Sequence, residues 1–309
     1  MKRYFYVLLL FLIWITACED KVDLNIKPGE SQIVIDAWVT IEPGTKQVIT
    51  LSRTTPYLEN NPLPLVRGAF VQITNQTSGR TFNFSESYSG AYVYQLNPND
   101  SLGSIGDRFM LSVQVEGETY QAFSQANRVP SFNDDSIFVE SRPQEFGNPP
   151  GLFVDFNVRD LPGIGDFYFM RTYYNGKLRA LPQDLIVISD ITIFGRNFDP
   201  RQDGLPFIFP IRSTVNRPLC TDGCNDRPYK VGDTITLEIL SITSEAFDFW
   251  TQVQTQATNV GLLASPPSNV PTNIQNVNPN GKKAVGFFTV SAVVRAGVRI
   301  KEENLIIIR

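Results

Sequence analysis

The sequence predicts a mainly β protein, in which an N-terminal immunoglobulin-like β-sandwich precedes a second β-rich domain with one amphipathic helix. The 309-residue chain contains 21 Gly and 21 Pro and is 12% aromatic but only 19% charged, which favours a loop-rich β protein over a helical bundle. From residue 32 onward, short runs alternate apolar and polar residues, and turn residues separate them. A convincing helical period occurs in one segment, near 244–258.

Seven alternating runs between residues 32 and 126 predict the sandwich. The first places Ile33, Ile35 and Val39 on one face, and the last two form a hairpin around Glu116-Gly117. Seven strands in about 95 residues is the size of an immunoglobulin-like domain. The runs are 31–40, 47–53, 68–75, 80–86, 90–96 and the two arms of 108–124.

A polar segment that contains Pro130 predicts a linker at 127–135, and strand patterns resume in a second domain at 136–309. Asn175-Gly176 is a hairpin signal within it. We expect the final apolar stretch, 285–300, to close this domain as a pair of adjacent strands. The other expected strands are 136–141, 151–160, 166–177, 184–194 and 234–242.

The predicted helix begins at a favourable capping position, because Thr243 or Ser244 can accept a hydrogen bond from the first turn. Glu245 is favourable at the positive end of the helix dipole. We expect the apolar stripe to pack against a sheet rather than to hold a cofactor. The stripe consists of Ala246, Phe247, Phe249, Trp250, Val253 and Ala257.

The N-terminus predicts a secretory signal peptide over residues 1–17. Lys2 and Arg3 precede an apolar run at 4–15, which is shorter than the ~20 residues that a membrane-spanning helix needs. The segment Ile15-Thr16-Ala17-Cys18 resembles the lipobox of bacterial lipoproteins. This resemblance implies that the Cys18 thiol carries a diacylglycerol and that acyl chains anchor the protein in a lipid bilayer. The alternative is an ordinary signal peptide with an incidental cysteine.

Residues 18–31 are expected to form the anchor and tether. The acids that follow Cys18 resemble the short acidic tag that sends lipoproteins of the phylum Bacteroidota to the outer face of the outer membrane. We therefore expect an outer-membrane protein that faces the cell exterior, and the alternative is a solvated tether. The acids are Glu19, Asp20 and Asp23.

Charge and histidine content exclude several classes of function. Without residues 1–17 the chain has 25 basic and 31 acidic residues, a formal charge of −6, which makes nucleic acid a poor partner. The sequence contains no histidine, so Ser-His-Asp triads, Cys-His pairs and imidazole zinc sites are excluded. No metal or cofactor site is expected.

Beyond Cys18, the remaining thiols are Cys220 and Cys224. In an oxidising compartment they predict a local disulfide that closes a short loop, and the alternative is a redox-active pair. Two sulfurs are too few for a four-cysteine zinc site.

Two surface features are weaker predictions. The loop from Thr55 to Gly68 is long and proline-rich, and Tyr57, Asn60 and Asn61 could form a contact edge rather than merely cover the end of the sandwich. Ser136, which Asp135 precedes and Ile137 follows, resembles an acceptor of Bacteroidota O-glycosylation.

The chain also resembles a known family over residues 18 to about 300. The resemblance is carried by the Cys18 start, by IVIDAWVTIEPGTKQVITLSRTTPYLENNPLPLVRGAFVQIT and LEILSITSEAFDFW, and by SPPSNVPTNIQN and AVGFFTVSA. The family is a Bacteroidota lipoprotein group of unknown function, often encoded beside TonB-dependent outer-membrane receptors, and it has no assigned catalytic residues. The 203–230 segment departs from it. The resemblance implies a place in the outer membrane and a receptor as partner.

These observations predict a non-enzymatic accessory lipoprotein that partners a TonB-dependent receptor in nutrient uptake. The sequence contains no nucleophile elbow or phosphate-binding loop. One alternative is an adhesin or matrix-binding structural lipoprotein. The other is a surface glycoside hydrolase with paired carboxylates, although in a protein of strands and turns its acids are expected to be turn residues. The acids in question are Asp155, Asp160, Asp166, Asp190, Asp199 and Asp203.

Overall fold

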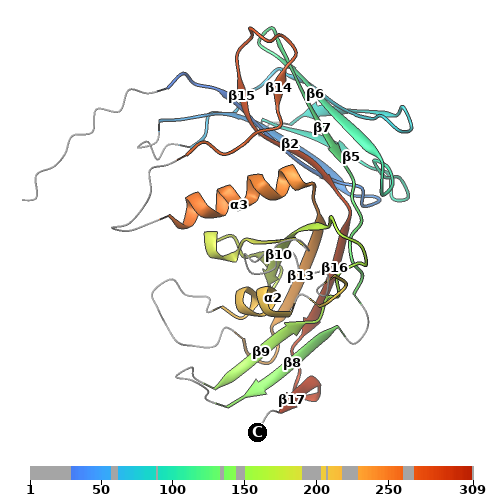
Figure 1. Cartoon of the computed structure of the whole chain (residues 1–309), viewed down its shortest axis with the longest axis vertical. Helices are drawn as coiled ribbons and strands as arrows, with labels where there is room; N and C mark the ends of the chain where they lie inside the picture. The colour runs from blue at the N-terminus through green and yellow to red at the C-terminus, as the bar shows by residue number, and fades with distance from the viewer. Residues whose placement is uncertain are drawn as a thin grey trace, which may run out of the picture. The chain divides into compact units, whose positions relative to one another are not determined.

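The computed structural model describes most of the chain from residue 29 onward, and its strands dominate, which confirms the mainly β class (Figure 1). Several residues to which the sequence assigns a role lie outside the described residues. They are Cys18, the cysteine pair Cys220 and Cys224, and the loop residues Tyr57, Asn60 and Asn61. No helix in the described part is long and apolar enough to span a membrane. The described residues are 29–56, 62–87, 90–132, 136–143, 150–189, 203–206, 208–217, 229–259 and 268–307.

The largest sheet has nine strands, seven from the N-terminal half of the chain and two from residues 275–291, in the order β14-β7-β6-β3-β4-β5-β2-β1-β15. Seven of its strands are those that the alternating pattern predicts. All neighbours within the sheet are antiparallel except β1 and β15, which pair in parallel. The strands are β1 (Ile33–Thr40), β2 (Lys46–Arg53), β3 (Phe70–Asn75), β4 (Thr81–Glu86), β5 (Ala91–Gln95), β6 (Arg108–Val115), β7 (Glu118–Gln125), β14 (Gln275–Asn276) and β15 (Ala284–Ser291).

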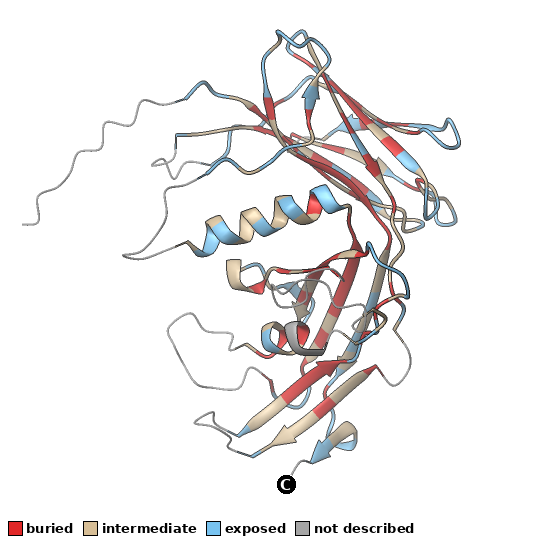
Figure 2. Ribbon diagram, viewed as in Figure 1, coloured by how far each residue is buried: buried red, intermediate tan, exposed pale blue. Residues whose placement is uncertain are grey.

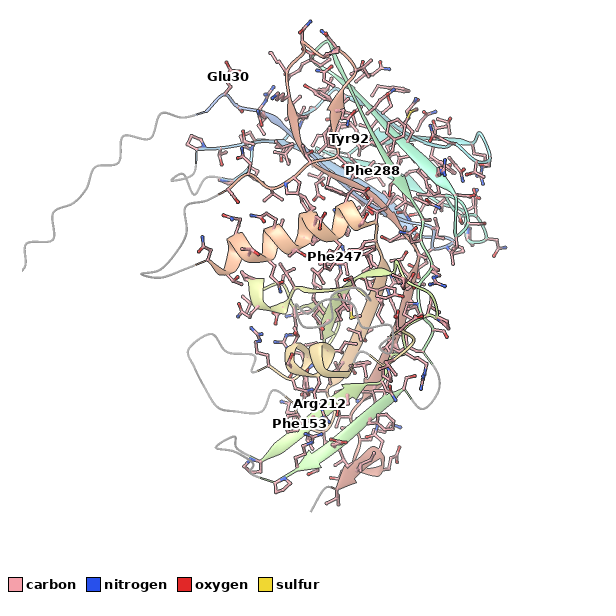
Figure 3. All side chains as sticks on the ribbon, viewed as in Figure 1. Glu30, Tyr92, Phe153, Arg212, Phe247 and Phe288 are labelled. Carbon is pink, nitrogen blue, oxygen red and sulfur yellow. The ribbon has the colours of Figure 1, made fainter. Side chains whose placement is uncertain are left out.

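This sheet wraps around one hydrophobic core and nearly closes on itself. Residues of β1 to β7 and of β15 are buried in that core, and Tyr92 and Phe288, labelled in Figure 3, are among them. Where its two ends approach, the Ser124 hydroxyl on β7 accepts a hydrogen bond from the Val290 N–H on β15 at 3.0 Å. The Asn273 side chain donates to the Phe288 carbonyl at 2.8 Å. Hydrogen bonds from side chains therefore connect the two ends of the sheet, where β7 and β15 do not pair through their backbones.

The structure corrects the prediction that 285–300 forms a pair of adjacent strands. β15 pairs with β1 over its whole length, whereas β16 (Val293–Arg299) pairs with β13 (Thr234–Ser241) in another sheet. Because β1 would otherwise present an open edge of unpaired backbone groups, a strand from the far end of the chain covers it. β14 and β15, which come from the segment predicted as the second domain, 136–309, thus add two strands to the sheet formed by residues 33–125.

The C-terminal half contains two smaller sheets and a second core (Figure 2). One has the order β11-β10-β13-β16, with β12 also paired to β10, and the other has the order β17-β8-β9. Helix α2 (Ile208–Val215) is tied to β9 because the side chain of Asn216 bonds both the N–H and the carbonyl of Val154 at 2.8 Å. The strands are β8 (Ile137–Arg142), β9 (Gly151–Phe156), β10 (Phe167–Tyr174), β11 (Lys177–Leu178), β12 (Ile186–Ser189) and β17 (Leu305–Ile307).

The predicted helix is confirmed as α3 (Ser244–Thr258). The Thr243 hydroxyl caps it by accepting a hydrogen bond from the Ala246 N–H at 3.2 Å. Its apolar stripe packs where β1 and β10 approach it, and Trp250 contacts Trp38 and Phe169 there. The stripe ends before Ala257, which is exposed. Core packing is thus the observed role of the stripe.

Candidate functional site

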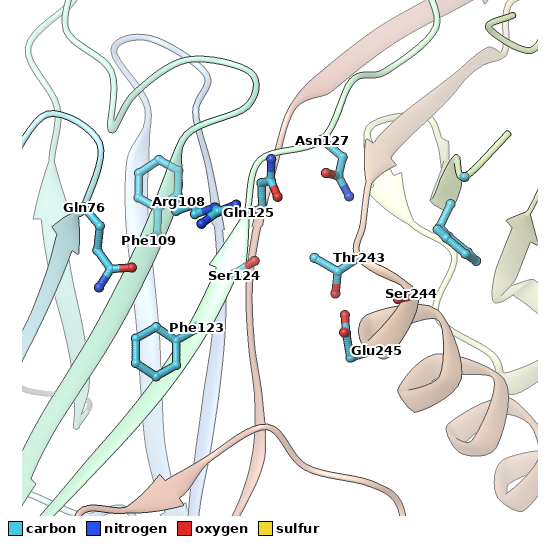
Figure 4. A pocket seen from close by; sticks show the side chains of 12 residues that line it. Gln76, Arg108, Phe109, Phe123, Ser124, Gln125, Asn127, Thr243, Ser244 and Glu245 are labelled. Atoms are coloured by element: carbon cyan, nitrogen blue, oxygen red, sulfur yellow. The ribbon is translucent and has the colours of Figure 1, made fainter. Parts of the chain in front are cut away.

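The strongest candidate site is an open cleft of about 540 Å³, bounded on one side by β6 and β7 and on the other by the start of α3 (Figure 4). We call it the β6–α3 cleft. Its volume falls within the range of small-molecule sites, roughly 300–1,000 Å³. Its lining residues are Gln76, Arg108, Phe109, Phe123, Ser124, Gln125, Asn127, Gly165, Phe167, Thr243, Ser244 and Glu245.

Strand alternation places the side chains of the first wall. On β7, Ala122 and Ser124 are buried, so Phe123 points outward and is 55% exposed. Gln125 lies two residues along the same face and pairs with Arg108 across the β6–β7 ladder. This register brings an exposed aromatic ring, an amide and a guanidinium to one surface.

Buried Asn75 shapes the turn that carries Gln76, and this turn is bonded to Arg108 at the start of β6. Asn75 is 1% exposed, its side-chain oxygen accepts from the Thr77 N–H at 2.9 Å, and its amide donates to the Leu102 carbonyl at 3.1 Å. The turn is then bonded to β6, since the Gln76 N–H donates to the Arg108 carbonyl at 2.8 Å. Asn75 therefore positions Gln76 and Arg108 from beneath.

The loop that precedes β6, which Asn75 also contacts, predicts a pH-dependent stability. Hydrogen bonds from the Ser104 N–H and then from the Asn75 amide hold the pKa of Asp107 below its usual value. Because that pKa is lowered in the folded state, its stabilising contribution is present above the unfolded pKa of about 4 and is lost as pH falls through the folded pKa. Asp107→Asn is therefore expected to lower the free energy of unfolding at pH 7, with the loss narrowing as pH falls below about 4.

Urea unfolding between pH 3 and pH 7 measures this difference. Asp248→Asn, which changes an exposed carboxylate on α3, is the matched control and should shift stability little at either pH. A deficit in Asp107→Asn that stays constant across the range would contradict the proposed role of this carboxylate.

The second wall is held to the first by the segment that follows β7. The Asn127 amide donates to the Ile242 carbonyl at 2.9 Å, and the Ser241 hydroxyl donates to the Asn127 carbonyl at 2.7 Å. These bonds fix the end of β13 immediately before α3, whose first residues, Ser244 and Glu245, are exposed at the cleft. The described part of the predicted 127–135 linker therefore forms part of the site.

Four polar side chains at the cleft make no hydrogen bond or ion pair with another described residue. They belong to Gln76, Arg108, Ser244 and Glu245. Figure 4 shows Arg108 and Glu245 on opposite sides of the space. The cleft therefore offers uncommitted donors, acceptors and both signs of charge beside an exposed phenyl ring, a composition suited to binding a polar ligand.

Among the described residues that line the cleft, Glu245 is the one carboxylate, so these residues do not supply the paired carboxylates that a glycosidase needs. A second cavity, of about 570 Å³, lies beside Phe249 and Lys283 and has no carboxylate among its described lining residues. The described lining residues of the two cavities therefore include no pair of carboxylates.

Three of the acids expected at turns are buried and hydrogen-bonded. Asp155 lies within β9, contrary to that expectation, whereas Asp160 and Asp166 flank the bend at 161–165. Asp155 on β9 accepts from Arg212 Nε on α2 at 2.7 Å, and Asp166 accepts from Arg128 at 2.9 Å. Asp160 accepts from the hydroxyl of Tyr168 at 3.1 Å. A buried carboxylate needs a hydrogen-bond donor, and for Asp155 and Asp166 that donor is an arginine from a distant segment, which sequence spacing does not show.

Tyr168 and Asp203 also bear on the predicted acids. Burial raises the pKa of Tyr168, and the neighbouring carboxylates of Asp166 and Asp160 raise it further. Asp203 lies in a turn, as was expected, and its carboxylate accepts a hydrogen bond from the Gly163 N–H at 2.9 Å. Asp190 and Asp199 lie outside the described residues.

The structure describes two of the remaining predicted sites, Ser136 and part of the contact loop, and does not describe the cysteine sites. Ser136 is 4% exposed, so a glycan on its hydroxyl would have to be attached before this part of the chain folds. In the contact loop, the structure describes residues 55–56 and 62–68, and the second of these segments exposes Leu63 and Leu65. The lipidation and disulfide predictions concern cysteines outside the described residues.

Sequence reasoning missed the residues of the β6–α3 cleft. One signal was available for Phe123, because in the run Tyr120 to Ser124 the alternation that buries Tyr120 and Ala122 turns Phe123 outward. No local signal brings Arg108 and Glu245 to one space, because 137 positions separate them in the chain.

Comparisons with known structures give distant likeness. A crystal structure of a DUF4785 family protein from Legionella pneumophila matches at 11% identity and a TM-score of 0.21, covering 68% of this chain and 52% of that one. A structure from a 1.5-MDa bacterial ice-binding adhesin matches at 13% identity and a TM-score of 0.20, covering 71% and 61%. The chain thus spans less than two thirds of either. No curated protein matches the chain.

A family model gives the assignment that these distant structures do not. The model described as a domain of unknown function (DUF4249) matches residues 19–296, which include every strand from β1 to β15 and both labelled helices. The chain belongs to the DUF4249 family.

Proposed function

We propose that this protein is a non-catalytic lipoprotein on the outer face of a Bacteroidota outer membrane, where it partners a TonB-dependent receptor and captures a nutrient. The lipobox-like segment before Cys18 and the acids after it support the location. The resemblance to lipoproteins encoded beside such receptors supports the choice of partner. Membership of a family of unknown function is compatible with this role and leaves the partner to be identified.

The observation that carries the binding role is the β6–α3 cleft. Its free polar side chains and the exposed ring of Phe123 can hold a ligand, while Glu245 has no second carboxylate beside it among the lining residues that the structure describes. A tethered protein with such a cleft can hold a ligand near a membrane-embedded receptor without chemical turnover.

Anchoring predicts a large change in location for one substitution. Replacing Cys18 by alanine removes the thiol to which the diacylglycerol is attached, so the protein should lose its acyl chains and leave the membrane fraction. A clickable fatty acid should label the wild type and not the Cys18→Ala variant. Membrane association that persists without Cys18 would contradict lipid anchoring.

Affinity purification from the native host tests the choice of partner. After gentle detergent extraction, a TonB-dependent receptor should co-purify with the tagged wild-type lipoprotein, and the Cys18→Ala variant serves as the matched control for membrane placement. Isolation of the lipoprotein without a receptor, together with binding to glycans or host matrix, would instead support the adhesin.

A further inference from the structure

We infer that the β6–α3 cleft binds a short peptide with free termini, with its ammonium group at Glu245 and its carboxylate at Arg108. This inference names the chemical class of the captured nutrient, and it rests on the proposed function. The observation behind it is the pair of uncommitted opposite charges on the two walls of one cleft (Figure 4).

The arginine side has the chemistry to recognise a carboxylate. A guanidinium group offers a planar fork of N–H donors that matches two carboxylate oxygens. The neighbouring Arg128 is already committed to Asp166, with two hydrogen bonds of 2.9 and 2.6 Å, and Arg80 is committed to Asp100. Arg108 makes no such pair within the described part of the chain, so its fork is available to a ligand.

The helix side has the chemistry to recognise an ammonium group. Glu245 stands in the first turn of α3, is exposed at the cleft and is bonded to no described side chain. A carboxylate there also excludes a simple anionic ligand, which it would repel. Arg108 in turn repels a simple cation. A ligand with both charges satisfies both walls.

The rest of the lining suits the body of a peptide. Each peptide unit presents one donor and one acceptor, and the Gln76 amide and the Ser244 hydroxyl can pair with such groups. Phe123 offers an exposed ring against which an apolar side chain can pack. A neutral saccharide could use the ring and the amides but would leave both charges without a partner, so the peptide fits better.

Calorimetric titration of the purified mature lipoprotein in detergent tests the inference. The probes are the tripeptide Ala-Phe-Ala with free termini, its N-acetylated form, its C-amidated form and the neutral trisaccharide maltotriose. We expect the free tripeptide to bind, either blocked form to bind at least about tenfold more weakly, and maltotriose not to bind.

Two variants assign each end of the peptide. In Arg108→Gln, amidation of the peptide should no longer weaken binding, while acetylation still should; Glu245→Gln should show the reverse pattern. Arg299→Gln and Asp248→Asn, which change exposed charges outside the lining residues, are matched controls and should bind like the wild type. Circular dichroism checks that each variant is folded.

The outcomes separate this inference from the proposed function. Binding of maltotriose in place of the tripeptide, or equal binding of free and blocked tripeptides, would overturn the peptide assignment even if a receptor co-purifies. Selective peptide binding without a co-purifying receptor would retain the assignment and overturn the receptor partnership.

Discussion

Gly286→Ala is expected to destabilise the protein by about 4 kcal/mol or more, because an added methyl group has no space between β1 and β15. A Cβ atom built at Gly286 lies 2.1 Å from the Ile35 carbonyl oxygen and 2.7 Å from its carbonyl carbon. The obstacle is backbone, which cannot rotate away as a side chain can. Gly286 also has a φ of +107°, a conformation that favours glycine.

Thermal unfolding of wild type and variant measures the effect, and a loss of this size should lower Tm by about 10 °C in a chain of this length. Gly117→Ala is the matched control, since Gly117 has a φ of +81° but nothing within 4 Å of the added atom. It should cost about 1 kcal/mol, from the backbone conformation alone. Equal stability of the two variants would contradict the close approach of β1 and β15.

Trp250→Ala is expected to cost about 3 kcal/mol, the lower end of the range for truncating a large aromatic side chain, because Trp250 is partly buried against the core cluster. The Trp250 ring stacks on Phe169 of β10, with centroids 4.6 Å apart and planes at 22°. It also meets Trp38 of β1 edge-on at 5.0 Å. Because the three residues come from a helix and from two different sheets, this substitution should weaken the packing that joins them.

Trp250→Phe should be much milder, costing less than about 1.5 kcal/mol. The indole N–H of Trp250 is buried and has no acceptor among the described residues, so removing it relieves a desolvation cost that offsets part of the lost contact area. Urea unfolding monitored by circular dichroism measures both variants. Phe123→Ala, which truncates an exposed ring, is the control and should stay within about 0.5 kcal/mol of wild type. A Trp250→Ala variant as stable as this control would contradict the packing of Trp250 against Trp38 and Phe169.

Intrinsic tryptophan fluorescence measures the environment of the cluster formed by Trp38, Phe169 and Trp250 independently of unfolding. The sequence contains three tryptophans, and Trp14 falls within the predicted signal peptide. The mature protein would retain Trp38 and Trp250, which contact each other, so its fluorescence follows the environment of this cluster alone.

The sequence predicted the elements whose causes are local. The seven N-terminal strands follow from period-two alternation, as in the run from Ile33 to Val39, and α3 follows from its Thr243 cap and apolar stripe. Both patterns depend on residues within one turn or one strand of each other, and burial in the structure follows the same alternation.

Features that depend on distant segments could not be predicted in this way. The pairing of Ile35 with Gly286 joins residues 251 positions apart, and the run that contains Gly286 has no local property that assigns it to the first sheet rather than the second. The burial of Asp155 depends in the same way on Arg212, which comes from a separate helix. The β6–α3 cleft is a product of such long-range pairings.

Photo-crosslinking in living cells of the native host tests the receptor partnership most directly. A photoreactive amino acid is placed in turn at four exposed apolar positions, Leu63, Phe123, Ile164 and Ile307, and captured proteins are identified by mass spectrometry. We expect a TonB-dependent receptor to be captured from at least one position, and not when Cys18 is also replaced by alanine. Capture of no receptor from any of the four positions, by a protein that is folded and displayed on the cell surface, would contradict the proposed function.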